Sequence, residues 1–274
     1  MFAFANRNAL IFGAAKGIGR ATAGEFCRRG ARLAIADLNM EAARETAQSL
    51  VDSGAEAVAI PCDVGCELSV REAAVSAEQA LGDIDIVMNN VGGLLHGQLE
   101  DVPLAEWERI LSINLLSVAR SSAIFVPKMI RRGSGYIVNV GSFAGLYPFA
   151  TTRMPYVAAK AAVLALSESM AIYLKPQGVH VSCLCPGPVR TNVLDGMKTW
   201  TANLEMRGPG STLRLKSAEE VAALLADGMC EAKVIIPTDD AVWEIMRQHV
   251  ADPDTFIQKK IDEFASGDMG RPAR

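Results

Sequence analysis

Tyr156 and Lys160 are the residues whose types and spacing could perform acid–base chemistry. Pro155 suits the first turn of a helix, and the alanine-rich residues after it predict a helix that runs through Tyr173. Residues four apart lie on one face of a helix, so the phenol and the ammonium can approach each other. A tyrosine titrates near ~10 in water, and a neighbouring ammonium lowers that pKa toward the range of a working base. A surface tyrosine and lysine could share this spacing by chance, so the interpretation depends on the residues upstream.

A glycine-rich turn is predicted near the start of the chain. Residues 8–12 form a short apolar run suited to a buried strand, and residues 21–29 read as an amphipathic helix. Between them lie Gly13, Gly17 and Gly19, where the backbone can approach a pyrophosphate at the helix N-terminus. The spacing is Gly-x-x-x-Gly-x-Gly and not the common Gly-x-Gly-x-x-Gly. Alone, it also fits a tight turn in any α/β protein.

Asp37 ends the next predicted strand, residues 32–37, about twenty residues after the glycine turn. A carboxylate there can accept hydrogen bonds from both ribose hydroxyls and repels a 2′-phosphate, which favours NAD over NADP. Lys16 and Arg20 favour the opposite choice, because a cation in the loop could pair with that phosphate. Asp37 penalises NADP directly, so we expect NAD. Alternatively Asp37 caps the next helix, although Asn39 is the better candidate for a cap.

Strands and helices continue to alternate along the chain. Further strands are expected at 57–61, 84–89, 135–142 and 179–185, with helices between them. This alternation predicts a doubly wound parallel sheet with helices on both faces. In such sheets ligands bind at the carboxyl ends of the strands, and every motif described above falls at such an end.

Several polar residues follow these strands. Asp63 is placed to meet an adenine amino group, or it is simply a turn aspartate. Asn89 and Asn90 offer two amides that can tie neighbouring strand ends together. Ser142 stands at the end of the central strand, and the rigid Pro186-Gly187 turn could place backbone groups against a flat amide ring.

Asn114 lies in a long apolar stretch, residues 104–129, that is predicted to be helical. An amide inside such a helix must find hydrogen-bond partners or cost free energy. A structural hydrogen bond and a role in holding a catalytic water both account for it.

The composition of the 274-residue chain limits the classes of function. Half of the residues are apolar, the net charge is −4 and no Lys/Arg block stands out, so neither nucleic acid nor a membrane surface is an expected partner. No uncharged apolar run reaches the ~18 residues that a membrane span needs, and the first residues do not resemble a signal peptide. The six cysteines contain no CxxC pair, and Cys62 and Cys66 have no histidine nearby. We expect reduced cysteines, a cytoplasmic protein and no metal site.

These motifs together resemble those of the classical short-chain dehydrogenase/reductase family. The resemblance is dense over residues 6–191 and looser through 234–236. It implies one domain, residues 1–274, with a Rossmann fold and a seven-stranded parallel sheet that binds dinucleotide and substrate together. A homodimer or homotetramer is also expected. The motifs that carry the resemblance are Gly13-x-x-x-Gly17-Ile18-Gly19, Asp37, Asp63, Asn89-Asn90-x-Gly92, Asn114, Ser142, Tyr156-x-x-x-Lys160 and Pro186-Gly187.

The resemblance also implies roles for single residues. Tyr156 would exchange a proton with the substrate oxygen, and Lys160 would lower the pKa of that tyrosine and bind the nicotinamide ribose. Ser142 would hydrogen-bond the alcohol or carbonyl, and Asn114 would hold a water that links Lys160 to solvent. The cofactor would contact Gly13, Lys16, Gly17, Ile18, Gly19, Asp37, Asp63, Val64, Asn90, Gly92, Tyr156, Lys160, Pro186, Gly187, Val189 and Thr191.

The chain departs from the family pattern in three places. Phe12 stands where the family usually has threonine, so one turn-fixing hydrogen bond is missing, and Val91 replaces an alanine. The tail, residues 237–274, lacks the usual Asp-Gly-Gly and carries two predicted amphipathic helices, 241–249 and 253–264. These helices could cover the substrate mouth, make a subunit contact or pack on the domain's own core.

The predicted substrate surroundings are mostly apolar, with segment 190–215 covering them. They indicate a hydrophobic, ring-bearing secondary alcohol or its ketone. No arginine in this set is clearly directed at a substrate carboxylate, although Arg153 could be. His96 could reach the pocket, but a loop histidine without a partner is more often incidental. Alternatives are an NADPH-dependent ketone or 3-oxoacyl-type reductase and a non-catalytic dinucleotide sensor. The expected lining residues are Leu94, Leu95, Phe143, Tyr147, Phe149, Met154 and the segment Val193 to Met206, with Met197 and Trp200.

Overall fold

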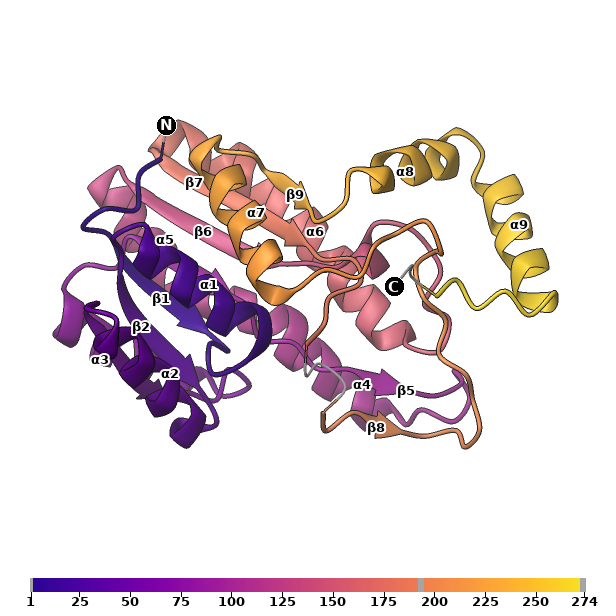
Figure 1. Cartoon of the computed structure of the whole chain (residues 1–274), viewed down its shortest axis with the longest axis horizontal. Helices are drawn as coiled ribbons and strands as arrows, with labels where there is room; N and C mark the ends of the chain where they lie inside the picture. The colour runs from indigo at the N-terminus through magenta and orange to yellow at the C-terminus, as the bar shows by residue number, and fades with distance from the viewer. Residues whose placement is uncertain (1, 192–194, 272–274) are drawn as a thin grey trace.

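The computed structural model describes residues 2–191 and 195–271, and its centre is a seven-stranded sheet (Figure 1). Neighbouring strands pair in parallel throughout, in the order β3-β2-β1-β4-β6-β7-β9. The predicted doubly wound parallel sheet is therefore confirmed. The strands are β1 Asn8–Phe12, β2 Arg32–Asp37, β3 Ala57–Pro61, β4 Ile86–Asn89, β6 Gly135–Val140, β7 Val179–Cys185 and β9 Ile235–Pro237.

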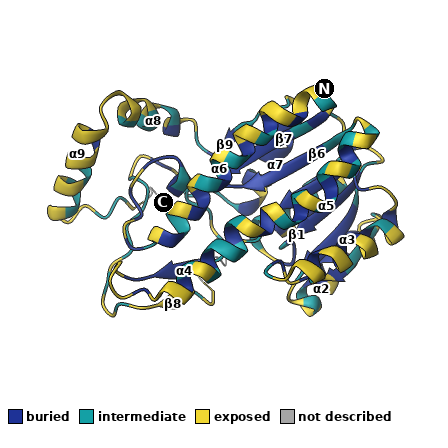
Figure 2. Cartoon of the chain, turned by 180° about the vertical axis from the view of Figure 1, so that it is seen from behind, coloured by how far each residue is buried: buried dark blue, intermediate teal, exposed yellow. Residues whose placement is uncertain are grey.

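Helices cover both faces of this sheet. Alternate side chains of a strand point to opposite faces, so Ile11 of β1 packs in the layer of α1, α2 and α7, whereas Leu10 packs in the layer of α3, α5 and α6. In Figure 2 the strands are buried and the outer helix surfaces are exposed. The helices of these layers are α1 Gly17–Arg28, α2 Met40–Asp52, α3 Glu67–Leu81, α5 Ser117–Arg132, α6 Met154–Leu174 and α7 Ala218–Cys230. Helix α4, Leu104–Leu111, packs instead in a separate cluster with Leu95 and Val102.

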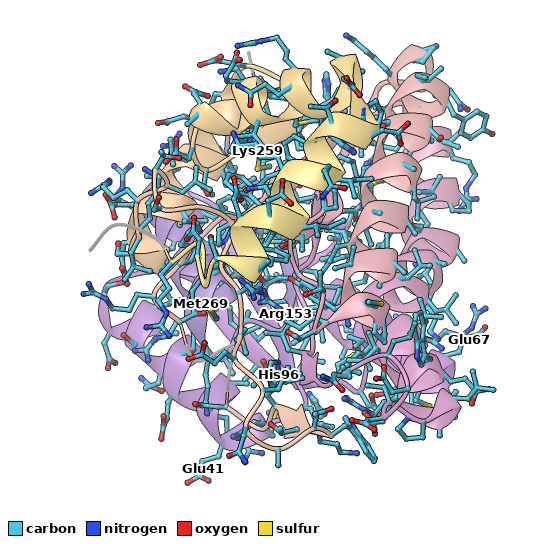
Figure 3. All side chains as sticks on the ribbon, turned by 90° about the vertical axis from the view of Figure 1, so that its right-hand side faces the viewer. Glu41, Glu67, His96, Arg153, Lys259 and Met269 are labelled. Carbon is cyan, nitrogen blue, oxygen red and sulfur yellow. The ribbon has the colours of Figure 1, made fainter. Side chains whose placement is uncertain are left out.

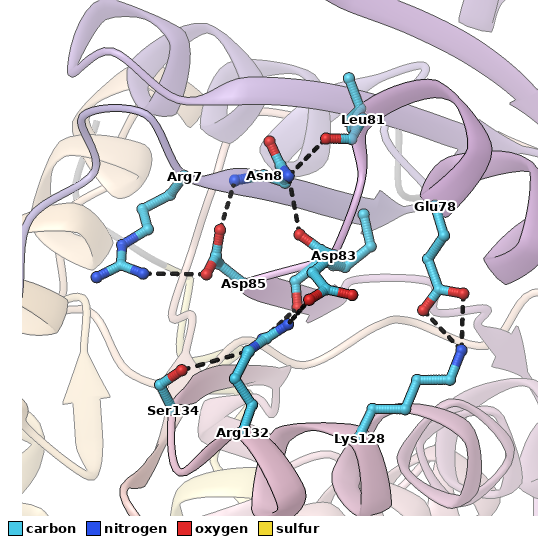
Figure 4. Close-up of polar contacts among 10 residues, drawn as sticks. Arg7, Asn8, Glu78, Leu81, Asp83, Asp85, Lys128, Arg132 and Ser134 are labelled. Atoms are coloured by element: carbon cyan, nitrogen blue, oxygen red, sulfur yellow. Dashed lines mark hydrogen bonds and ion pairs between the residues drawn. The ribbon is translucent and has the colours of Figure 1, made fainter.

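Polar contacts hold the amino ends of the strands, opposite the edge at which ligands are expected (Figure 4). Asn8, the first residue of β1, donates its side-chain amide to the carbonyls of Leu81 (2.7 Å) and Asp83 (2.8 Å). Its backbone N–H donates to the carboxylate of Asp85, which also pairs with Arg7 at 3.0 Å. The start of β1 is thus tied to the loop that leads into β4.

The long predicted helix at 104–129 is not one regular helix. A π-helical segment, Ser112–Leu116, joins α4 to α5, and Pro127 lies inside α5. By length and composition alone, the stretches Leu104–Arg132 and Met154–Gln177 would also suit a membrane span. Both stretches have buried residues against the sheet, and the buried helices of α/β proteins meet the same criterion.

The C-terminal region extends away from the sheet, and its end then returns to the loop around Gly208 (Figure 1). Helices α8, Ala241–Ala251, and α9, Pro253–Ala265, bury Val242 and Phe256 in a cluster that includes Tyr147. The chain after α9 then pairs with an earlier loop, since the N–H of Gly208 donates to Met269 O at 2.8 Å. One of the three expectations for the tail helices is observed, because Val242 of α8 and Phe256 of α9 pack on the domain's own core. No residue of α8 or α9 lines the cleft described next, although Arg271 beyond them does.

Candidate active site

A cleft of about 1140 Å³ lies at the carboxyl ends of the strands. All of the predicted catalytic and cofactor-binding residues line it except Gly19 and Asn114, which stand directly behind its wall. The predicted residues that line the cleft are Gly13, Lys16, Gly17, Ile18, Asp37, Asp63, Val64, Asn90, Gly92, Ser142, Tyr156, Lys160, Pro186, Gly187, Val189 and Thr191.

The glycine turn requires glycine for geometric reasons. Gly13 and Gly17 have φ angles of +76° and +55°, in the left-handed region that disfavours other residues. A Cβ on Gly19 would lie 2.2 Å from the carbonyl oxygen of Gly13. The Asn90 side chain donates to that same carbonyl at 2.6 Å, which confirms that this amide ties β1 to the chain after β4. Phe12 is buried in the core, and the Asn90 bond fixes the turn in the absence of a threonine there.

Asp37 holds the turn from the neighbouring strand. Its Oδ2 accepts the N–H of Ala15 at 3.0 Å, and its Oδ1 accepts the N–H of Asn39 at 2.9 Å. The cap of α2 is Asn39, whose side chain accepts the N–H of Ala42, so the capping alternative for Asp37 is wrong. The first N–H groups of α1 have no side-chain cap, which leaves them available to an anion. Both features face the cleft.

Other polar groups lie at this end of the cleft. Lys16 lines it, whereas Arg20 is exposed and does not. Asp63 accepts the N–H of Gly65 at 2.8 Å, as expected of a turn aspartate, and it also lines the cleft. Within residues 2–191 and 195–271, no group of three or more metal-binding side chains occurs.

Lys160 is buried beside Tyr156 on α6. Its Nζ donates to the carbonyl of Val140 at 2.8 Å and lies 5.6 Å from the centroid of the Tyr156 ring. Burial lowers the pKa of Lys160 to about 8, because desolvation disfavours the ammonium. The two residues therefore share one face of the helix, as the spacing predicts.

The environment of Tyr156 differs from the expectation in one respect. Burial raises the pKa of its phenol, while a hydrogen bond from Ser142 and the positive charge of Arg153 lower it. The expected lowering by Lys160 is not found, since the lysine ammonium is directed to Val140 O. In the protein alone, Arg153 is the cation that acts on the tyrosine.

Ser142 follows β6 and begins the short 3₁₀ segment η2, Phe143–Gly145. Its Oγ accepts the N–H of Ala144 at 3.1 Å, which orients the hydroxyl. A Cβ on Gly145 would lie 2.6 Å from the carbonyl carbon of Lys160, so this glycine lets η2 lie directly on α6. The close packing brings the serine to the tyrosine.

Asn114 belongs to the π-helical segment. Its Nδ2 donates to Ile110 O (2.9 Å) and Gly93 O (3.1 Å), which confirms the structural hydrogen bond expected for this buried amide. Its Oδ1 is buried and has no hydrogen-bond partner in the described part of the chain. A Cβ at Gly92 would lie 3.1 Å from that oxygen and 3.5 Å from Lys160 Nζ, so the two groups flank one small space.

A chain of buried side chains ties the helices to the sheet beneath the site. Ser121 of α5 donates to Asn89 at 2.6 Å, and Asn89 donates to Asn139 at 2.8 Å. Asn139 donates to Ser167 of α6 at 3.0 Å, and Ser167 donates to Val163 O. These bonds set the depth at which α5 and α6 pack on β4 and β6.

The far end of the cleft is lined by residues that the sequence did not single out. These are Arg109 and Arg271, which line it together with the expected Leu94, Phe143, Phe149 and Met206. Arg207, Gly208 and Pro209 also line it and belong to the segment 190–215 that was predicted to cover the substrate. Gly208 and Pro209 belong to the loop paired with the C-terminal tail, and no local pattern reveals that pairing.

Five of the expected lining residues are outside the cleft, and this part of the prediction was wrong. Leu95 is buried in a separate cluster, Tyr147 is buried and donates to Pro209 O, and Met154 and Trp200 are partly exposed. Met197 also does not line it, and Val193 lies outside the described residues. His96 pairs through Nε2 with Leu204 O, in the two-stranded sheet of β5, Leu95–His96, and β8, Lys198–Thr199.

Comparisons with known proteins agree with this geometry. Residues 7–202 match the family profile described as short chain dehydrogenase. Over 249 residues the chain is 30% identical to 2,5-dichloro-2,5-cyclohexadiene-1,4-diol dehydrogenase of Sphingobium indicum, a match that covers 88% of this chain and 97% of the relative.

Two solved structures are similar over nearly their whole length. A short chain dehydrogenase/reductase from Burkholderia phymatum in complex with NAD has a TM-score of 0.82 and 28% identity, covering 93% of this chain and 96% of the other. A short-chain dehydrogenase from Sphingobium yanoikuyae in complex with NADPH has a TM-score of 0.74 and 25% identity, covering 90% and 96%. Similar proteins thus bind either dinucleotide.

Proposed function

Because the chain belongs to the short-chain dehydrogenase family and is an oxidoreductase of alcohols, we propose that it interconverts a hydrophobic, ring-bearing secondary alcohol and its ketone with NAD(H). The observation that carries the proposal is the single cleft, which has Ser142, Tyr156 and Lys160 between a glycine turn with Asp37 and an apolar end. One cavity thus offers dinucleotide groups, a proton relay and an apolar substrate wall.

The residues present fit a dinucleotide. Gly13 and Gly17 keep the backbone open, the uncapped N–H groups of α1 suit a pyrophosphate, and Asp37 suits the ribose hydroxyls. We assign the adenine end to Asp63 and Val64 and the carboxamide end to Pro186, Gly187, Val189 and Thr191. When bound, the nicotinamide accepts or donates a hydride.

In this proposal Tyr156 is the acid–base group. In the oxidation direction its phenolate takes the hydroxyl proton of the substrate, and in reduction the phenol returns it. Ser142 hydrogen-bonds the same substrate oxygen and stabilises the charge that develops there. Burial raises the pKa of the phenol, so in this proposal Lys160 is the cation that favours the phenolate when substrate is bound.

Asn114 completes the proposed relay. Its buried Oδ1 has no partner within residues 2–191 and 195–271 and flanks the same space as Lys160 Nζ. A buried acceptor without a partner costs free energy, so a proton-carrying group in that space would stabilise it. We infer that a water held by Asn114 Oδ1 accepts protons from Lys160 and passes them to solvent.

The choice of NAD over NADP rests on Asp37. Its carboxylate lies on the cleft wall and is fixed by two backbone N–H groups, so it would meet a 2′-phosphate with its charge intact. Lys16 on the same wall is the feature that favours NADPH. For the substrate, the apolar end with Leu94, Phe143 and Phe149 supports a ring, as does the cyclic diol in the name of the Sphingobium indicum relative.

We also propose a homo-oligomer in a reducing compartment. The outer faces of α4 and α6 expose large apolar side chains, Leu104 at 73% and Ile172 at 80%, and exposed apolar surface favours association. The six cysteines are free thiols, which suits the cytoplasm. Light scattering during size-exclusion chromatography measures the mass of the assembly, and a monomeric mass would contradict the proposal.

The proposed function is tested by titrating the purified protein with NADH and, separately, with NADPH while nucleotide fluorescence is measured. We expect NADH to bind more tightly, followed by NAD reduction with cyclohexanol-type secondary alcohols. Tighter binding of NADPH would move the cofactor assignment to Lys16. If neither nucleotide binds, the proposed function is wrong.

A further inference from the structure

Arg153 is a partly buried cation at the apolar end of the cleft, and its charge has no acidic partner. It is the cap residue of α6, three positions before Tyr156. Among residues 2–191 and 195–271, no aspartate or glutamate forms an ion pair with it. Figure 3 views the molecule from the side on which α9 lies, and Arg153 is labelled on that side.

Most of the hydrogen-bonding capacity of Arg153 is unused. One N–H of Nη2 donates to the carbonyl of Arg207 at 2.7 Å. The Nε atom is buried and has no partner in the described chain, and the guanidinium lies 6.0 Å from the centroid of the Phe149 ring. A guanidinium carries five N–H donors and stays charged in proteins, so this one costs free energy unless an anion joins it.

Three of the other four arginines that line the cleft have their partners already, and the fourth, Arg190, is exposed. Arg109 pairs with Glu106 at 2.8 Å, and Arg271 pairs with Glu205 at 3.7 Å. Arg207 donates to the carbonyls of Asp268 and Phe264 in the C-terminal tail, and its guanidinium lies 3.9 Å from the centroid of the Phe264 ring. Arg153 therefore differs from its neighbours in being open toward the cavity.

The C-terminal tail fixes the orientation of this open guanidinium. The tail holds the side chain of Arg207, and the carbonyl of the same residue accepts from Arg153. Arg153 is thereby directed along the cavity wall between Phe149 and Tyr156, both of which line the cleft. A planar fork held in this way matches the two oxygens of a carboxylate or sulfonate.

We propose that the substrate carries a singly charged oxyanion, a carboxylate or a sulfonate, on the apolar ring, and that Arg153 is the residue that recognises it. This inference rests on the proposed function, because it names the substrate class of the same cleft. The anion would pair with Arg153 while the ring contacts Phe149 and the hydroxyl reaches Tyr156. The proposed substrate is thus a cyclic hydroxy acid or its sulfonate counterpart.

The test uses cyclohexanecarboxylate, cyclohexanesulfonate and the neutral cyclohexanecarboxamide as probes, titrated by ligand-observed NMR with and without NADH. We expect at least one anion to bind tenfold or more tightly than the amide. Arg153→Met should remove that preference and leave amide binding unchanged, whereas Arg153→Lys should retain part of it. Arg131→Met, the same change at an exposed arginine of α5, is the matched control and should have no effect.

Two outcomes would overturn the inference. If the wild-type protein binds the anions and the amide with equal affinity, it has no oxyanion site. This outcome can be read without any variant. A preference that persists in Arg153→Met assigns the anion to another cation. NADH binding is followed in the same samples, so its failure would count against the proposed dehydrogenase, while the anion titrations still decide the role of Arg153. The stronger of the two anions distinguishes a carboxylate from a sulfonate substrate.

Discussion

The ammonium of Lys160 donates to the carbonyl of Val140 at 2.8 Å and not to the phenol of Tyr156, four residues earlier on the same helix. The lysine is thus fixed to the last residue of β6, at the level of the cleft floor. The carbonyl holds the cation in place, so no conformational search of a long side chain is needed when a cofactor arrives.

Burial of this cation predicts an unusual dependence of stability on pH. The pKa of Lys160 is about 8 in the folded protein and 10.5 for a lysine exposed to water, so between these values the unfolded chain binds more protons and stability rises with pH. Relative to Lys160→Met, the unfolding free energy of the wild type should rise by about 3 kcal/mol from pH 8 to pH 10.5. Urea unfolding of both proteins at several pH values measures it. If the difference in unfolding free energy between the wild type and Lys160→Met does not change with pH, the lysine is not buried as a cation.

Tyr156→Phe should reduce turnover by at least ~100-fold, because the proton transfer loses its acid–base group. NADH binding should change little, since the ring and its packing remain. Tyr173→Phe, on the exposed side of the same helix, is the matched control and should keep full activity. Turnover is measured by absorbance of the reduced nicotinamide. If the Tyr156 variant is as active as the control, Tyr156 is not the acid–base group.

Asp37→Ala should weaken the preference for NADH over NADPH by about tenfold or more, because the variant lacks the carboxylate that repels the 2′-phosphate of NADPH. NADH itself should also bind less tightly, since Ala15 loses the acceptor of its N–H. Fluorescence titrations with both nucleotides give the ratio, and Asp52→Ala at an exposed position of α2 serves as the comparison. An unaltered ratio would leave Asp37 with a structural role only.

Ser167→Ala should destabilise the protein by about 1–3 kcal/mol, because the buried amide of Asn139 loses its acceptor. Ser169→Ala, two residues along α6, removes an exposed hydroxyl and should cost less than about 0.5 kcal/mol. Thermal or urea unfolding separates the two variants. Equal stabilities would mean that the buried chain of side chains contributes little to the packing of α6.

The sequence predicted well those parts of the fold that depend on local patterns. Apolar runs bounded by turn residues placed β1, β2, β3 and β7 at their observed limits. Strands buried on both faces, such as β1 and β7, leave a continuous apolar signal, and the less buried edge strand β3 also keeps an apolar run. Glycines with positive φ and strand-end polar residues identified the part of the cleft that we assign to the cofactor for a similar reason, since each meets a local geometric demand.

The substrate side was predicted less well, because it is formed by long-range contacts. Pairing of Gly208 with Met269 joins segments about sixty residues apart, and neither segment carries a periodic signal for it. Tyr147 was expected to face the substrate as an aromatic near Ser142, yet its hydroxyl donates to Pro209 O and its ring packs on Phe256 of α9. The direction of Lys160 was likewise not predictable, since a backbone carbonyl competes with the phenol for its protons.

The polar contacts around Asn8 and Asp85 stand at one end of the parallel strands, and the cleft stands at the other. This separation has an evolutionary consequence. Mutations that exchange one substrate for another fall on loops at the carboxyl ends, where they leave the joint between β1 and β4 untouched. A lineage with this architecture can therefore acquire new alcohols as substrates while its capacity to fold is inherited unchanged.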